Sequence, residues 1–161
     1  MSRCTIGPAA TPEALHTIIE DGFNRYDVDA VVAAYEDDAV LISPGGALAL
    51  GRNDIRAATV QRMALQPKMS LVLVKKVEGD ETAVTHGHWR MAITTPDGNR
   101  REMTGRGTLV CRRRRDGSWG IVLDDLGVDR SFGAGHATNP VAKRHPSVPT
   151  AGTRPTATLR Y

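Results

Sequence analysis

One carboxylate stands out as a candidate for proton transfer. Trp119, Ile121 and Leu123 form an apolar row at every second position, as on one face of a strand. Asp125 continues that row, so the sequence predicts a carboxylate on an apolar face. In such a setting its pKa rises and it can act as a general base. The alternatives are a solvated strand end and an ion pair with Arg106.

Arg106 lies between Gly105 and Gly107 within another predicted strand. Glycines inside a strand are typical of a bulge that curves the sheet and redirects the side chain between them. An inward guanidinium would suit an anionic ligand such as a carboxylate. An outward one would be a surface charge, and the sequence leaves both orientations open.

His86 and His88 are spaced to lie on one face of a strand. A pair of this kind can supply two ligands to a metal ion, but a third is required and the sequence indicates none. We therefore predict no metal site. If Trp89 points inward, both histidines point outward, toward solvent or a subunit contact. His88 remains a candidate acid or base.

Tyr35 is predicted to end a short helix that begins after Asp27, where its hydroxyl would reach the mouth of a pocket. The alternative is a tyrosine of the core. The candidate catalytic residues are thus Asp125, Tyr35, Arg106 and His88. No glycine-rich phosphate loop is present, so no cofactor is predicted. The predicted pocket consists of Phe23, Tyr35, Ser43, Trp89, Arg106, Trp119, Ile121, Leu123 and Asp125.

Charge is distributed unevenly along the chain. The 161 residues carry 21 basic and 18 acidic side chains, but residues 131–161 hold four of the basic ones and no acidic one. The first 130 residues therefore have a net charge of −1. Domains that bind nucleic acid usually concentrate positive charge on the folded surface, so we predict no nucleic-acid partner. The four arginines at 112–115 precede an Asp-Gly turn, where they are predicted to solvate a loop and protect a sheet edge.

The elements that position these residues follow from periodicity and turn signals. Helices are predicted from Thr11 to Arg25, from Asp27 to Tyr35 and from Asn53 to Gln66, the last with Arg62 on its apolar side. A short strand at 39–43 precedes the third helix. Four long strands follow it, at 68–78, 82–94, 100–113 and 118–128, and short turns pair them antiparallel. The order ααβαββββ predicts an α+β domain, over residues 11–130, with three helices packed on the sheet.

The two ends of the chain lack such patterns. Residues 1–10 are predicted to be loose, and residues 131–161, which are rich in proline and threonine, to be extended or disordered. Docking of this basic tail on a partner subunit is the alternative. No apolar run is long enough to span a membrane and no signal peptide is evident, so we predict a cytoplasmic protein with no membrane partner.

The sequence resembles the nuclear transport factor 2-like superfamily, in its SnoaL-like and ketosteroid-isomerase-like branch. The segments that carry the likeness are FNRYDVDAVVAAYEDDAVLISPGG, GRNDI and GRGTLVCRRRRDGSWGIVLDD. The resemblance covers about residues 11–128. It implies a cystatin-like cone, in which a curved antiparallel sheet wraps three helices around a pocket, and a homodimer formed through the outer face of the sheet. The matching positions are Phe23, Asp27, Asp29, Tyr35, Asp37, Asp38, Gly51, Arg52, Gly117 and Trp119.

The resemblance also bears on chemistry. The isomerase of this branch uses an aspartate base, a tyrosine and a protonated acid. Ser43, Ile19 and either Arg106 or Gly107 stand at those positions here, so that mechanism is not expected. What the resemblance implies is a pocket for a small hydrophobic or anionic metabolite of polyketide or steroid type. The pocket would support acid–base chemistry of a lyase, isomerase or hydrolase, or else belong to a non-catalytic dimerisation or ligand-binding module; the sequence leaves this choice open.

Overall fold

The computed structural model describes residues 7–95 and 97–128, so the predicted tail and most of the predicted loose N-terminus lie outside them. The described residues form three helices and six strands in the order ααββαββββ. No helix among them combines the length and apolar character needed to cross a bilayer. The elements are α1 (Pro12–Arg25), α2 (Val28–Ala33), β1 (Tyr35–Ile42), β2 (Leu48–Leu50), α3 (Gly51–Met63), β3 (Lys68–Glu78), β4 (Thr82–Thr94), β5 (Arg100–Arg113) and β6 (Trp119–Val128).

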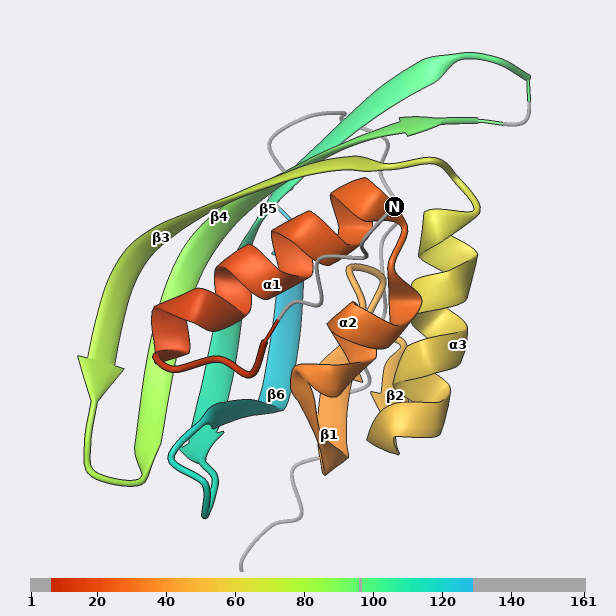
Figure 1. Ribbon diagram of the computed structural model, residues 1–161. Helices are drawn as coiled ribbons and strands as arrows, with labels where there is room; N and C mark the ends of the chain where they lie inside the picture. Colours follow the sequence, from red (N-terminus) through yellow and green to blue (C-terminus); the bar gives the residue numbers. More distant parts are fainter. Residues whose placement is uncertain (1–6, 96, 129–161) are drawn as a thin grey trace, which may run out of the picture.

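The strands form one sheet in the order β2-β1-β6-β5-β4-β3. The long strands curve around α1, while α2 and α3 lie beside it toward β1 and β2 (Figure 1). The predicted α+β class, a curved sheet packed on three helices, is confirmed. The topology of the sheet differs from the prediction in two ways. A short β2 pairs with β1, and β1 pairs parallel to β6, which the chain reaches through α3 and the β3–β5 meander.

The two N-terminal helices begin where the capping residues predict. The Thr11 hydroxyl accepts a hydrogen bond from the Ala14 amide at 3.3 Å, and the Asp27 carboxylate accepts one from Ala30 at 3.0 Å. Tyr26 adopts the left-handed conformation (φ 59°) that ends α1. The tight connection between α1 and α2 packs the two helices together, with Val31 of α2 close to Gly22 of α1.

Tyr35 is not part of the second helix, which ends at Ala33. It begins β1 instead, where its backbone aligns with Ile121 of β6 and the Ile121 amide donates to the Ala34 carbonyl at 2.8 Å. Pairing with a neighbouring strand outweighs the helical spacing because an aromatic residue packs well in a sheet. The change carries the Tyr35 side chain into the interior, where it is 2% exposed.

The glycines around Arg106 do not mark a bulge, because β4 and β5 pair without interruption through this region. Gly105 provides space for Trp89 instead. A Cβ atom added to Gly105 would lie 2.5 Å from Cζ2 of the indole, closer than carbon atoms can approach. The indole therefore lies against the backbone of β5, and Arg106 is exposed on the opposite face.

The chain before α1 also takes part in the fold. Ala9 is buried and its carbonyl accepts a hydrogen bond from the Trp119 amide at 2.8 Å. Within the stretch predicted to be loose, this contact ties the backbone to the start of β6.

Candidate functional site

A cavity lies under the concave face of the sheet and has two compartments. The larger compartment has a volume of about 270 Å³ and is lined mostly by apolar side chains of α3, β4 and β5, among them Met91. The smaller one has a volume of about 30 Å³ and lies against Asp124 and Tyr35. The two compartments adjoin because both are lined by Arg62, Met69, Trp89 and Leu126. An apolar enclosure with a few polar groups is typical of a small-molecule site.

The polar end of the smaller compartment is a hydrogen-bonded pair. The Tyr35 hydroxyl donates to Oδ2 of Asp124 at 2.6 Å, and Asp124 is only 3% exposed. Its second oxygen, Oδ1, is buried and has no hydrogen-bond partner among the described residues. An acceptor in this position can take a proton or a hydrogen bond from a bound molecule.

Burial raises the pKa of the Asp124 carboxyl to about 6. The Tyr35 hydrogen bond and the positive charge of Arg62 both oppose this rise, and the negative charge of Asp125 adds to it. Burial, with the nearby Asp124 charge, also places the pKa of Tyr35 well above its ordinary value, so the phenol stays protonated. A carboxylate with a pKa near 6 is suited to exchange protons near neutral pH.

Asp124, not Asp125, faces the cavity because β6 contains a bulge. Cys111 pairs with Ile121, whereas the preceding Val110 pairs with Leu123, so Val122 is an extra residue in the strand. The insertion reverses the alternation beyond it, which turns Asp124 inward and leaves Asp125 half-buried and outside the cavity lining.

The structure corrects several placements in the predicted pocket. Phe23, Tyr35, Ser43 and Trp89 line the cavity. The remaining five predicted pocket residues do not: Trp119 and Ile121 are core residues beyond it, Leu123 and Asp125 follow the bulge, and Arg106 is exposed on the outer face.

The histidine that reaches the cavity is His16 of α1, which was not predicted. Its Nε2 lies 2.8 Å from Oγ1 of Thr85, it lines the smaller compartment, and burial lowers its pKa. His86 and His88 are exposed. Side chains alternate between the two faces of β4, and Trp89 points inward, so both histidines point outward. Among the described residues, no three histidine, cysteine, aspartate or glutamate side chains converge as a metal site.

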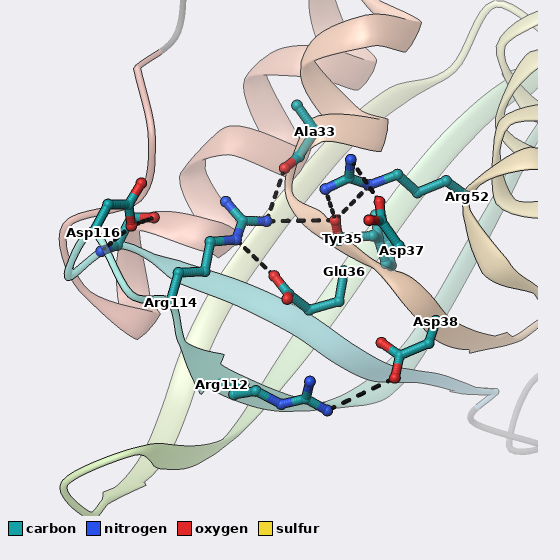
Figure 2. A network of polar contacts seen from close by, with 10 residues as sticks. Ala33, Tyr35, Glu36, Asp37, Asp38, Arg52, Arg112, Arg114 and Asp116 are labelled. Carbon is teal, nitrogen blue, oxygen red and sulfur yellow. Dashed lines mark hydrogen bonds and ion pairs between the residues drawn. The ribbon is translucent and has the colours of Figure 1, made fainter.

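A network of arginines fixes the backbone at Tyr35 (Figure 2). Arg52 donates from Nε and Nη2 to the Tyr35 carbonyl at 2.8 and 2.6 Å, and pairs with Asp37 at 2.9 Å. Arg114 approaches the same carbonyl at 3.4 Å and donates from Nε to Glu36 at 2.6 Å. These contacts hold the start of β1 and so determine where the Tyr35 hydroxyl lies.

Two other arginines of the run at 112–115, Arg112 and Arg113, also have partners within the chain. Arg112 lies 4.0 Å from the Asp38 carboxylate, and Arg113 lies 3.6 Å from Glu78 with its guanidinium over the Trp119 ring. Carboxylates of the same domain thus partly neutralise the positive charge that suggested a nucleic-acid surface.

Arg114→Ala is expected to lower the free energy of unfolding by about 1–3 kcal/mol, because it leaves a half-buried Glu36 without its partner and removes the bonds to the backbone carbonyls. Arg115→Ala is the matched control: Arg115 is exposed, so its loss is expected to change stability by less than about 0.5 kcal/mol. Urea denaturation of both variants measures the difference. Equal losses in the free energy of unfolding of the two variants would contradict a stabilising role for the Arg114 contacts.

Comparisons with known proteins agree with this architecture. A family model described as a SnoaL-like domain matches residues 16–120. A search of curated proteins finds no match. Among solved structures, a ketosteroid isomerase-like protein from Erwinia carotovora atroseptica superimposes with a TM-score of 0.66 and 22% identity, over 72% of this chain and 92% of that one.

Two further structures share the fold. One is a proposed calcium/calmodulin-dependent protein kinase type II association domain from Thiobacillus denitrificans, with a TM-score of 0.65 and 20% identity over 77% of this chain and 99% of that one. The other is a proposed dehydratase of the nuclear transport factor 2-like family from Streptomyces avermitilis, with a TM-score of 0.64 and 15% identity over 73% and 93%. At these identities the likeness establishes the fold alone.

Proposed function

The chain belongs to the SnoaL-like domain family, and we propose that it binds a small apolar molecule in the cavity and transfers a proton through Asp124. The observation that carries this proposal is the buried, unpartnered Oδ1 of Asp124, a residue that lines the smaller compartment while Tyr35 occupies Oδ2. A buried acceptor without a partner costs stability, and such costs are typical of functional sites.

In the proposed reaction, Oδ1 of ionised Asp124 takes a proton from a carbon or hydroxyl of the ligand and returns it to the same molecule at another position. The Tyr35 hydroxyl donates to Oδ2 throughout and keeps the carboxylate oriented. Other ionisable groups around Asp124 are His16 on α1, Arg62 on α3, Cys111 on β5 and Asp125 on β6. Burial raises the pKa of Cys111 to about 12, so its thiol stays neutral.

The size of the cavity limits the ligand. A volume of about 270 Å³ for the larger compartment lies just below the usual range for small-molecule sites, roughly 300–1,000 Å³. This favours a molecule with one or two rings over a four-ring steroid. The apolar lining of α3, β4 and β5 supports a hydrophobic skeleton, and Asp124 marks where its acidic proton would lie.

The proposal is tested by proton exchange, which does not require the natural substrate to be known. We expect the protein to accelerate deuterium incorporation next to the carbonyl of 1-tetralone, a two-ring ketone, in D₂O, with saturation at increasing ketone concentration. NMR follows the loss of the proton signal. Exchange at the rate of buffer alone, across a set of one- and two-ring ketones that bind, would overturn proton transfer and leave a binding module.

We also propose that the chain forms a homodimer through the outer face of the sheet. Val72 and Val74 of the edge strand β3 are 59% and 61% exposed, and Val72 pairs with the outward His88 of β4. Exposed apolar side chains on a sheet favour association. The fold shared with a proposed association domain supports the same interpretation.

Val72→Lys is expected to convert a dimer to a monomer, because the charged group would be buried without a partner in the contact. Analytical ultracentrifugation measures the mass in solution. Val60→Lys, at an exposed valine of α3, is the matched control and is expected to leave the dimer intact. A wild-type monomer at all concentrations would contradict the homodimer.

A further inference from the structure

Arg62 is a half-buried cation inside the cavity. It lies near the end of α3 and lines both compartments. Its guanidinium carbon is 5.3 Å from the centre of the Phe23 ring, and its Nε donates to the Ala58 carbonyl at 3.3 Å. The two terminal nitrogens have no hydrogen-bond partner among the described residues, so most of the donors of this group are unused.

Arg62 differs in this respect from other arginines of the fold. Arg52, Arg56 and Arg114 each have a carboxylate within 2.9 Å, and all three lie at the surface or its margin. No carboxylate of the described residues lies within 4.0 Å of Arg62, although it is surrounded by apolar side chains. A half-buried cation in an apolar cavity has lost part of its contact with water and has no anion beside it, so an anionic ligand would be favoured there.

Asp124 does not fill this role. Although the charge of Arg62 opposes the rise in the pKa of Asp124, the two side chains are too far apart to form an ion pair. The carboxylate instead receives its hydrogen bond from Tyr35. Arg62 therefore keeps its charge available toward the larger compartment.

A second donor lies in the same cavity wall. Trp89 is 5% exposed, and its indole N–H has no acceptor among the described residues. Trp89 and Arg62 line both compartments, and the rest of the shared wall, Met69 and Leu126, is apolar. A buried donor without an acceptor, beside an arginine whose terminal nitrogens are unpaired among the described residues, indicates that the missing acceptor belongs to the ligand.

Building on the proposed small-molecule function, we propose that the ligand is an apolar carboxylate, held by the guanidinium of Arg62 and the indole N–H of Trp89. A carboxylate matches the planar fork of an arginine and can accept from a further donor at the same time. Its apolar skeleton occupies the larger compartment, and the Arg62 contact gives preference for an anion over a neutral molecule of the same shape.

The test compares two probes of nearly identical shape, naphthalene-2-carboxylate and naphthalene-2-carboxamide. Isothermal titration calorimetry at pH 7.5 is expected to show that the wild-type protein binds the carboxylate at least about tenfold more tightly than the amide. Arg62→Met, which preserves length and removes charge, is expected to reduce this ratio to about one. Arg62→Lys is expected to retain part of it, and a melting curve establishes that each variant is folded.

Arg56→Met on the same helix is the matched control, because Arg56 is exposed and paired with Asp29, and it is expected to keep the wild-type ratio. If wild type binds both probes equally, or if the preference survives in Arg62→Met, the carboxylate proposal is overturned while ligand binding in the cavity stands. If the wild type binds neither these probes nor the ketones, the proposed function falls as well.

Discussion

Asp124→Asn is expected to lower the rate of proton exchange on a bound ketone by about 10²–10⁴-fold, the usual contribution of a positioned general base. The amide keeps nearly the shape of the carboxylate and can accept the hydrogen bond from Tyr35, so the cavity stays intact. What it loses is the ability to take a proton at Oδ1, the oxygen that has no partner among the described residues. The rate at saturating ketone should fall while the concentration for half-saturation changes little.

Asp125→Asn is the control that makes this result specific. The two aspartates are adjacent in sequence, but only Asp124 lines the cavity. The Asp125 variant is therefore expected to keep exchange within about threefold of the wild type, a change that corresponds to the loss of a neighbouring negative charge. Equal losses in both variants, or activity in Asp124→Asn that disappears only when Asp125 is also replaced, would contradict the assignment of Asp124 as the base.

Asp124→Asn is also expected to stabilise the protein above pH 7. The pKa of Asp124 rises from 3.8 unfolded to about 6 folded, so folding favours the protonated form. The contribution of protonated Asp124 to the free energy of unfolding is therefore fully present below pH 3.8. This contribution is lost as the pH rises through about 6. The loss amounts to about 3 kcal/mol at pH 8, and asparagine, which cannot ionise, avoids most of it.

Urea denaturation of wild type and Asp124→Asn between pH 5 and pH 8 measures this effect. The variant should gain about 1–3 kcal/mol at pH 8 and roughly half of that at pH 5. Protonation of His16, whose pKa is lowered by burial, destabilises both proteins equally in acid and so cancels in the comparison. A variant less stable than the wild type at pH 8 would show that Asp124 is not a strained group, whatever its activity.

Much of the fold was predictable from the sequence because its local signals agree with its tertiary structure. The caps at Thr11 and Asp27, and the turns between the long strands, fall where the structure has them. Strand pairing across space was harder to predict. The contact of β1 with β6 joins residues more than 80 positions apart, and it places Tyr35 in a strand rather than a helix.

The candidate site was less predictable for the same reason. The bulge at Val122 has no signature in composition, since the residue is an ordinary β-branched strand former, and yet it decides which aspartate faces inward. His16 and Arg62 did carry a signal, because each polar residue interrupts the apolar side of its helix. Residues of that kind are either satisfied in the core or directed at a ligand, and only coordinates distinguish the two.

The extra residue in β6 has an evolutionary consequence. If the strand were to slip by one position and pair regularly, Asp124 would rotate away and its successor would rotate in. Because that successor is also an aspartate, either alignment presents an acid to the interior. The pair of adjacent aspartates would therefore keep a carboxylate in the interior after a one-residue shift in the register of β6. A single aspartate at this position would be lost from the interior by the same shift.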